Sequence, residues 1–361
     1  MKNLSYIIIL SILFISCKEK TANKTESTPV VIQTETPKIT QIASFKGQQV
    51  TGVSVSNEGR IFVNFPRWRN GVNNSVVEVE VGSNNHSPFP NKEWNSWEIG
   101  DKVEATKFIG VQSVVVYDNL IYVLDTRSPL FQEVLDAPRV FVFNINTKQL
   151  EHTYILSEGT YHANSYINDL RLDKKNNKIY FTDSGNSGLV ILDLKTEKFT
   201  RVLDNHPSTA AEVQFLTFDH KKWTNTVNSD GIALDTKNDK LYYHSLTGYS
   251  LYSIPTKALA LTNEKEVENA VTFEAKTSAP DGMIFDENGN LYYADLEHNK
   301  IMYRKTDGSI HTLIEGDIVK WADTFSIYNG YLYYTNSRIN EVTADISDME
   351  FTINKIELAK N

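Results

Sequence analysis

The sequence predicts an all-β fold, a β-propeller with six blades. Three observations predict it: one phrase recurs six times, each copy has the pattern of a β-hairpin, and long segments with helical periodicity are almost absent. A repeat of this size is typical of the four-stranded blade of a propeller. Because one blade cannot bury both faces of its sheet, the copies must pack around a common axis as a single domain.

The six copies are unevenly spaced. Alignment of one position in each copy gives spacings of 61, 56, 61, 51 and 42 residues, which fit a four-stranded unit with loops of variable length. The aligned residues are Gly52, Ser113, Asp169, Asp230, Asp281 and Asp323.

Each copy has the pattern of a hairpin, as in PDGMIFDENGNLYYADL, which begins at Pro280. The apolar residues Met283 and Phe285 alternate with polar ones, an Asn-Gly turn follows, and an aromatic run forms the return strand. Alternating segments between the copies supply the outer strands, for example residues 139–145, 188–194 and 250–255.

Composition excludes some partners. The 361 residues carry a formal charge of -9, and no stripe of Lys and Arg is present to bind a phosphate backbone. We therefore expect no nucleic-acid partner. The expected partner is a small-molecule ligand, and the expected state is a monomer.

The N-terminus has the features of a bacterial lipoprotein signal. Lys2 precedes an apolar run at residues 6–15, which is too short to span a bilayer and is typical of a signal peptide. The following LFISC resembles a lipobox, although Phe14 replaces the usual Leu, and Cys17 is the only cysteine of the chain. We expect cleavage after residue 16 and lipidation of Cys17.

The segment after Cys17 has a different composition. Residues 17–38 are rich in Thr, Lys, Glu and Pro, as in a flexible tether, and the propeller is expected over 39–361. The lipid anchor alone would contact the bacterial membrane. The predicted location is therefore extracytoplasmic, in the periplasm or on the cell surface.

Four aspartates open successive copies, and these positions belong to inner strands. Asp169, Asp230, Asp281 and Asp323 are thus expected to converge at one mouth of the central channel. Such a cluster raises the pKa of its members unless a cation balances it. With Asn168 and backbone carbonyls, it could hold a cation or a cationic ligand. Alternatively, each aspartate accepts backbone N–H bonds and is architectural.

A second series of polar residues ends the return strands. For these residues we expect hydrogen bonds that cap the neighbouring turns. The series comprises Asp125, Asp183, Asp295 and Asn336.

No catalytic residue emerges from the sequence. The eight histidines form no H-x-x-x-H pair, and His244 is expected to be a core histidine with satisfied hydrogen bonds. Ser184 lacks the G-x-S-x-G spacing of a nucleophile elbow, which argues against a serine hydrolase.

Six blocks outside the repeat carry a family resemblance. They are FVNFPRWRNGV (62–72), FPNKEWNSWE (89–98), LIYVLDTR (120–127), YINDLRLD (166–173), YFTDSGNSGLVILDL (180–194) and LYYTNSRI (332–339). Together they resemble the yellow and major royal jelly protein family, of which this chain is identified as a bacterial member. The resemblance implies a six-bladed propeller. Insect members are implicated in dopachrome conversion or bind biogenic amines in the channel, and Thr324 and Asn336 match pocket positions of the amine-binding relatives.

A more distant resemblance is to calcium-dependent gluconolactonases, through the phrases IND, SDG and PDG. In those enzymes Asn, Asp and Glu hold the metal. The Asn falls on Asp230, the Asp on Asp281 and the Glu on Thr51, so Asp230 and Asp281 are the metal ligands that this resemblance implies, with Ca²⁺ as cofactor. The replacement of Glu by Thr51 puts that site in doubt.

Three functions remain open. The first is a lipid-anchored protein that binds a small cationic or aromatic ligand through Asn168, Asp169, Thr324 and Asn336 without turnover. The alternative is a divalent-metal-dependent lactonase or related hydrolase that uses Asp230 and Asp281, and the third is a scaffold that binds another protein or a glycan.

Overall fold

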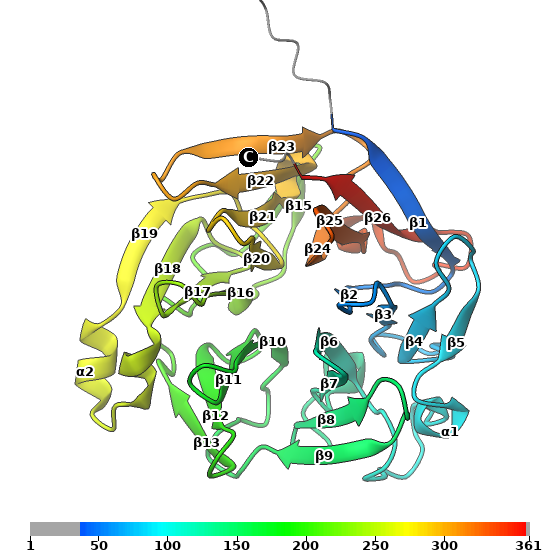
Figure 1. The fold of residues 1–361 in the computed structure, drawn as a ribbon, viewed down its shortest axis with the longest axis horizontal. Coiled ribbons are helices and arrows are strands. Elements are labelled where there is room, and N and C mark those ends of the chain that lie inside the picture. The colour runs from blue at the N-terminus through cyan, green and yellow to red at the C-terminus, as the bar shows by residue number, and fades with distance from the viewer. Residues whose placement is uncertain (1–36, 359–361) are drawn as a thin grey trace, which may run out of the picture. The chain divides into compact units, whose positions relative to one another are not determined.

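The computed structural model describes residues 37–358, and it is nearly all β. Six four-stranded antiparallel sheets form a closed ring, which confirms the six-bladed propeller (Figure 1). The predicted signal peptide, Cys17 and nearly all of the tether lie outside the described residues.

The first three blades follow one another along the chain. Blade 1 contains β2 (Gly52–Val55), β3 (Ile61–Asn64), β4 (Val76–Val79) and β5 (His86–Pro88). Blade 2 contains β6 (Val111–Tyr117), β7 (Leu120–Asp125), β8 (Arg139–Asn144) and β9 (Leu150–Ile155). Blade 3 contains β10 (Ile167–Asp173), β11 (Lys178–Asp183), β12 (Gly188–Asp193) and β13 (Lys198–Val202).

A short hairpin is inserted in the chain between blade 3 and blade 4. That hairpin, β14 (Leu216–Phe218) and β15 (Lys221–Trp223), precedes blade 4, which contains β16 (Ser229–Asp235), β17 (Lys240–Ser245), β18 (Ser250–Pro255) and β19 (Thr272–Lys276). Blade 5 contains β20 (Met283–Phe285), β21 (Leu291–Asp295), β22 (Lys300–Arg304) and β23 (Ile310–Glu315). Blade 6 contains β24 (Ala322–Tyr328), β25 (Tyr331–Asn336), β26 (Glu350–Glu357) and β1 (Ile39–Lys46).

Helices are short and lie in connections. The two α-helices are α1 (Lys92–Asn95) and α2 (Glu264–Asn269), and the 3₁₀ turns are η1 (Pro129–Phe131), η2 (Thr256–Ala260), η3 (Leu296–His298) and η4 (Ile339–Glu341). In the described part of the chain, no helix has the length and apolar character needed to cross a membrane.

The repeated phrase forms the two inner strands of every blade. In blade 5, Met283 pairs with Tyr293 and Phe285 with Leu291, across the Asn-Gly turn expected from the sequence. All six aligned positions lie at or just before the start of an innermost strand, so they occupy the same end of the ring.

The ring closes through a strand that the repeat analysis did not identify. β1 pairs antiparallel with β26, so that Ile39 lies opposite Ile356 and Lys46 opposite Glu350. Figure 1 shows this junction as the blue strand beside the dark red one. Because β1 carries no copy of the phrase, its role in blade 6 became visible only in the structure.

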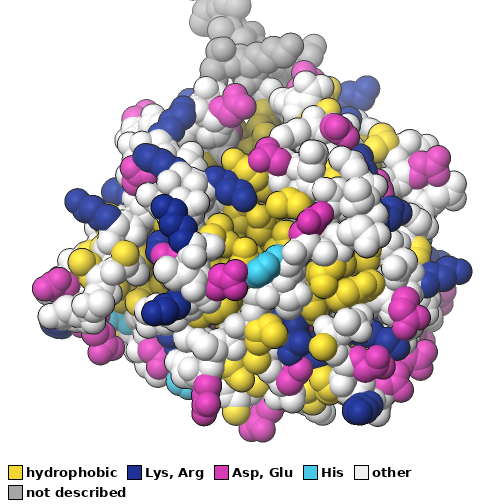
Figure 2. All heavy atoms as spheres, turned by 60° about the horizontal axis from the view of Figure 1, so that its bottom comes forward, with side chains coloured by type: hydrophobic (Ala, Val, Ile, Leu, Met, Phe, Trp, Pro, Cys, Tyr) yellow, Lys and Arg dark blue, Asp and Glu magenta, His cyan; other side chains and the backbone are white. Residues whose placement is uncertain are grey.

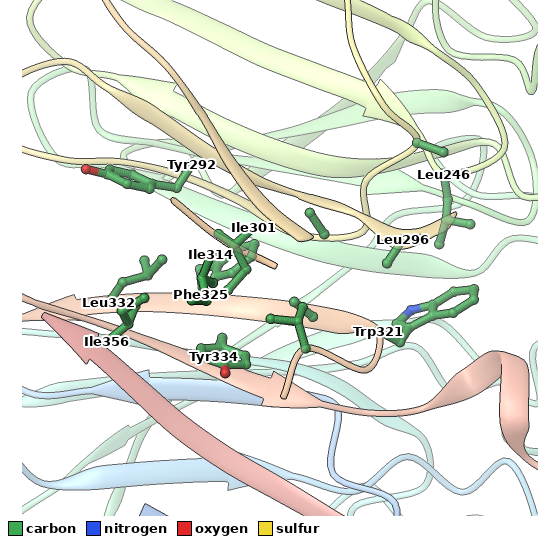
Figure 3. Packing of buried hydrophobic residues seen from close by; sticks show 14 of the residues in the cluster. Leu246, Tyr292, Leu296, Ile301, Ile314, Trp321, Phe325, Leu332, Tyr334 and Ile356 are labelled. Atoms are coloured by element: carbon green, nitrogen blue, oxygen red, sulfur yellow. The ribbon is translucent and has the colours of Figure 1, made fainter. Parts of the chain in front are cut away.

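Apolar side chains fill the wedges between blades. Between blades 5 and 6, Tyr292 and Ile301 face Phe325, Leu332 and other residues of the last blade (Figure 3). Trp321 lies at one end of this cluster, beside Leu296 and Leu246, and is 1% exposed. Large flat rings suit the space between twisted sheets, as the aromatic content of the sequence indicated.

The two most specific family blocks join blades 1 and 2. The buried Arg67 guanidinium donates to the carbonyls of Phe108 (2.7 Å) and Asn95 (2.9 Å). The Asn95 amide in turn accepts from the backbone N–H groups of Ser75 (2.8 Å) and Val76 (3.0 Å). Buried polar groups need such partners, so these residues are architectural.

Charge is mixed on the surface. On the face shown in Figure 2, hydrophobic side chains gather in the middle, and Lys and Arg are interspersed with Asp and Glu around them. The chain's net charge of -9 is therefore not collected into a single acidic field on this face.

Candidate functional site

A cavity of about 590 Å³ lies at the axis, at the end of the ring where the innermost strands begin. All six blades and the inserted segment contribute to its wall. Its polar lining includes the carboxylates of Asp230, Asp281 and Asp323, the amides of Gln49, Gln112 and Asn168, and the guanidinium of Arg69. Its aromatic lining comprises Trp68, Phe131, Tyr166, Trp223 and Trp321.

Close approach of neighbouring inner strands brings the three carboxylates together. The glycine after each of the first two aspartates makes this possible: a Cβ on Gly231 would collide with the Asp281 carbonyl oxygen, and one on Gly282 with the Asp323 carbonyl oxygen. The SDG and PDG phrases are thus required by packing, because only glycine allows this backbone contact.

Burial makes these carboxylates hard to ionise. Asp230, Asp281 and Asp323 are 5%, 7% and 6% exposed. Loss of solvation raises the pKa of Asp281 to about 7. Burial, followed by repulsion from the neighbouring carboxylates, raises the pKa of Asp230 and Asp323 well above the ordinary value. The three groups therefore hold protons more readily than ordinary carboxyls, and Asp230 and Asp281 lie close enough for each to act on the pKa of the other.

Side chains of neighbouring blades hold the carboxylates in place. Asn168 Nδ2 of blade 3 donates to Asp230 Oδ1, and Trp321 Nε1 of blade 6 donates to Asp281 Oδ2 at 2.7 Å. Within residues 37–358, no backbone N–H donates to the carboxylates of Asp230, Asp281 or Asp323. The architectural alternative considered for the aspartates does not describe these three.

The fourth aspartate is different. Asp169 accepts from its neighbour's backbone, Leu170 N, and from Ser113 Oγ, both at 2.7 Å. It also forms an ion pair of 2.7 Å with Arg171, whose other nitrogen reaches across to the Met283 carbonyl in blade 5 at 2.8 Å. Three of the four aspartates line the cavity, whereas the fourth is paired with Arg171. Asp169 is still near enough to raise the pKa of the other three carboxyls, so all four lie at the same end of the ring, as expected.

Arg171 was missed by the sequence reasoning. It follows the aspartate by two residues on β10, so strand alternation places both on the same face of the strand. The spacing of two residues between Asp169 and Arg171 could therefore have indicated the ion pair from the sequence.

One wall of the cavity is a run of aromatic rings from three blades. Trp68 stacks on Phe131 with ring centroids 5.1 Å apart, and Phe131 lies 5.5 Å from Tyr166. Trp68 Nε1 donates to the Tyr166 hydroxyl at 2.6 Å, which itself donates to Gln112 Oε1 at 2.7 Å. Phe131 is 63% exposed, so an apolar ring face is available at the mouth.

The opposite wall depends on the inserted hairpin. Trp223 and Phe218 of β14–β15 pack on Trp321, with centroids 5.0 Å and 5.4 Å away. Trp321 is also the donor to Asp281. The insertion therefore supports the indole that orients one of the buried carboxylates.

The predicted ligand residues separate into two groups. Asn168 lines the cavity, whereas Asp169, Thr324 and Asn336 do not. Asn336 accepts from the Lys320 backbone N–H at 2.9 Å and donates to the Ile318 carbonyl at 2.8 Å. Whether Asp169, Thr324 or Asn336 touches a ligand stays a prediction.

Two members of the series that ends the return strands, Asp125 and Asp183, form the expected capping hydrogen bonds. Asp125 accepts from the backbone N–H groups of Ile109 (2.7 Å) and Gly110 (2.8 Å), and Asp183 accepts from that of Tyr166 (2.9 Å). These carboxylates fix the loop that enters their own blade, which confirms their capping role.

His244 is confirmed as a core histidine. Its Nδ1 lies 2.6 Å from the Ser245 carbonyl and its Nε2 lies 2.9 Å from Thr277 Oγ1. Burial lowers the pKa of His244 to about 4, so the ring is neutral at physiological pH.

The residues present fit a calcium site poorly. In residues 37–358, no group of three or more His, Cys, Asp or Glu side chains is disposed around one ion position. The hydroxyl of Thr51, which stands where the glutamate ligand is expected, accepts from Asn64 Nδ2 at 3.0 Å. Ca²⁺ takes six to eight oxygen ligands. The metal assignment of Asp230 and Asp281 stays a prediction.

Comparison with solved structures supports the fold. A luciferin-regenerating enzyme is 13% identical, with a TM-score of 0.57 over 89% of this chain and 95% of the other. A gluconolactonase from Xanthomonas campestris is 12% identical, with a TM-score of 0.55 over 90% of both chains. At these identities the likeness concerns the fold alone.

Comparison with known sequences identifies the family. Major royal jelly protein 5 of Apis mellifera is 23% identical over 256 residues, and major royal jelly protein 3 is 22% identical over 246 residues. The matches cover 67% and 64% of this chain but 42% and 44% of those proteins. Residues 111–360 match the family described as "Major royal jelly protein". The chain belongs to the major royal jelly protein family.

Proposed function

We propose that this protein binds a small aromatic cation in its axial cavity without chemical turnover. The observation that carries the proposal is the combination of three buried carboxylates, whose pKa values burial raises, with two aromatic walls. A volume of about 590 Å³ lies within the range of ordinary small-molecule pockets, roughly 300–1,000 Å³.

The carboxylates favour a cationic group. Asp230 and Asp281 are close enough to share a hydrogen bond, and both have raised pKa values because they are buried together. In the protein without ligand, a bound proton offsets the negative charge of these carboxylates. An ammonium group placed against them would offset that charge instead. Binding would therefore release a proton, and affinity would rise with pH up to about 7.

The walls favour a flat ring. Trp68 and Phe131 present a stacked pair at one side, and Trp223 and Trp321 lie at the other. Aromatic rings also attract cations through their faces, most strongly when water is excluded. An aryl amine satisfies both walls and the carboxylates at once.

Calorimetry with tyramine and tryptamine at pH 7.5 tests this proposal. We expect binding that Asp230→Asn weakens by about tenfold or more, because the ammonium loses a charged partner worth at least about 1.4 kcal/mol. Asp307→Asn is the matched control, since Asp307 is exposed in the outer turn of blade 5. Absence of binding to both amines, or equal loss in both variants, contradicts the proposal.

The second candidate is the metal-dependent lactonase. It is favoured by Asp230 and Asp281, which line the cavity together and onto which the Asn and Asp ligands of gluconolactonases fall. Native mass spectrometry and melting curves with and without EDTA decide this point. A bound divalent ion, an EDTA-induced fall in Tm and hydrolysis of gluconolactone would replace the binding proposal with this one.

We further propose that the protein is secreted and held at a bacterial membrane by lipid on Cys17. The proposal rests on the sequence of the first seventeen residues. Detergent phase partitioning of the full-length protein made in a bacterial host tests it: the lipidated protein should enter the detergent phase.

A further inference from the structure

Arg69 stands out among the residues around the cavity. It follows β3 of blade 1 and lines the cavity wall. Its Nη1 donates to Gln49 Oε1 at 2.6 Å, and Gln49, which is 4% exposed, donates its own Nε2 to the Ser337 carbonyl at 2.8 Å. A neutral amide that is itself anchored to blade 6 thus positions the guanidinium.

Arg69 is partly buried and, unlike several other arginines of the described chain, has no carboxylate partner. Arg171 pairs with Asp169, Arg201 with Asp183, and Arg127 with Asp125 and Asp136. Burial lowers the pKa of Arg69, and no carboxylate of residues 37–358 counters that effect.

Most of the hydrogen-bonding capacity of Arg69 is also available. A guanidinium has five N–H donors in a fixed fork, and the bond to Gln49 uses one of them. The rest suit a bidentate contact with a carboxylate.

The cation and the buried carboxylates lie on different sides of the cavity. Arg69 follows β3 of blade 1 and Gln49 lies in the connection from blade 6 to blade 1, whereas Asp230 and Asp281 open the inner strands of blades 4 and 5. In a ring of six, blade 4 is directly across from blade 1. Glu133 also lines the rim but is exposed to solvent, where its charge is screened.

We propose that the cavity selects an aromatic zwitterion, with an ammonium group on Asp230 and Asp281 and a carboxylate on Arg69 at its other end. This deepens the proposed function and rests on it. The ring between the two charges lies against the aromatic walls. Specificity for the anionic end follows because Arg69 loses water on binding and gains a charged partner in exchange.

Two probes that differ at one group test the inference by calorimetry at pH 7.5 and low ionic strength. They are 4-(2-aminoethyl)benzoate and the neutral-ended 4-(2-aminoethyl)benzamide. We expect the benzoate to bind about tenfold more tightly, which corresponds to 1.4 kcal/mol. In Arg69→Gln the preference for the benzoate should be lost, so that the two probes bind about equally. In Arg69→Lys part of the preference should remain, because the charge is kept and the fork is lost.

Arg60→Gln is the control, since Arg60 pairs with Glu78 outside the cavity, and it should keep the full preference. Melting curves show that each variant is folded. If the benzamide binds as tightly as the benzoate in the wild type, or if Arg69→Gln weakens both probes alike, this inference is refuted and the binding of aromatic cations stands. If neither probe nor tyramine binds, the proposed function fails and this inference fails with it.

Discussion

Replacement of Asp281 by Asn is the most informative perturbation of the site. Asn has the same shape, keeps an oxygen to accept from Trp321 Nε1, and removes the ionisable group. Burial raises the pKa of Asp281 from 3.8 to about 7. At 1.36 kcal/mol per pKa unit, ionisation of Asp281 therefore costs about 4 kcal/mol more in the folded protein than in the unfolded chain.

The sign of the effect follows from linkage. The folded state binds the Asp281 proton more tightly than the unfolded state, so stability falls as pH rises from about 4 to about 7 and then levels off. Asp281→Asn removes this loss. We expect the variant without ligand to be more stable than the wild type above pH 7, by up to about 4 kcal/mol or ~6 °C in Tm, at about 2.1 cal/mol/K of unfolding entropy per residue.

Urea unfolding at pH 5.0, 6.0, 7.0 and 8.0 measures the effect. The wild-type free energy of unfolding should fall across this range, and the variant should show a shallower slope, since Asp230 and Asp323 still titrate with raised pKa values. Asp307→Asn, an exposed change in the same blade, should leave the slope between pH 5 and 7 as in the wild type. A variant that is less stable than wild type at pH 8, with an unchanged slope, refutes the reasoning.

Three further predictions concern other parts of the molecule. Arg171→Met should destabilise the protein by about 3–5 kcal/mol, measured by urea unfolding, because a largely buried Asp169 loses its cation; an unchanged free energy of unfolding contradicts the ion-pair role. Gly231→Ala should cost about 1–3 kcal/mol in the same assay, because the new Cβ meets the Asp281 carbonyl, and an unchanged free energy would contradict the close approach. Cys17→Ser should move the protein from the detergent to the aqueous phase in Triton X-114 partitioning without a change in the Tm of the soluble body, and partitioning of the wild type into the aqueous phase contradicts lipidation.

The sequence predicted the ring because its repeat is local. Alternation, turn residues and the return strand of each hairpin lie within about twenty residues, so each copy carries its own evidence. The strand β1 could not be found in this way, because its pairing partner β26 lies about 300 residues away and neither strand contains the phrase.

The site was predicted only in part. Asp230, Asp281 and Asp323 were identified because they occupy repeat positions, and Asn168 because it directly precedes one. Trp68, Arg69 and Trp223 lie in connections of unequal length, and nothing in their local sequence shows that they meet at the axis. Asn336 was assigned by analogy with relatives, whereas its hydrogen bonds at the end of β25 hold the backbone of the segment that leads into blade 6.

The junction of β1 with β26 affects how the chain acquires its fold. The strand made first in the described chain, Ile39–Lys46, has its partner at Glu350–Glu357, among the last residues made. Blades 1 to 5 can each form as they emerge, but the sixth sheet stays incomplete until synthesis is almost finished, and long-range pairing of this kind is slow. A chain that stops before Glu350 leaves both β1 and β25 with an unpaired edge. Closure of the ring therefore requires that the chain be synthesised through β26.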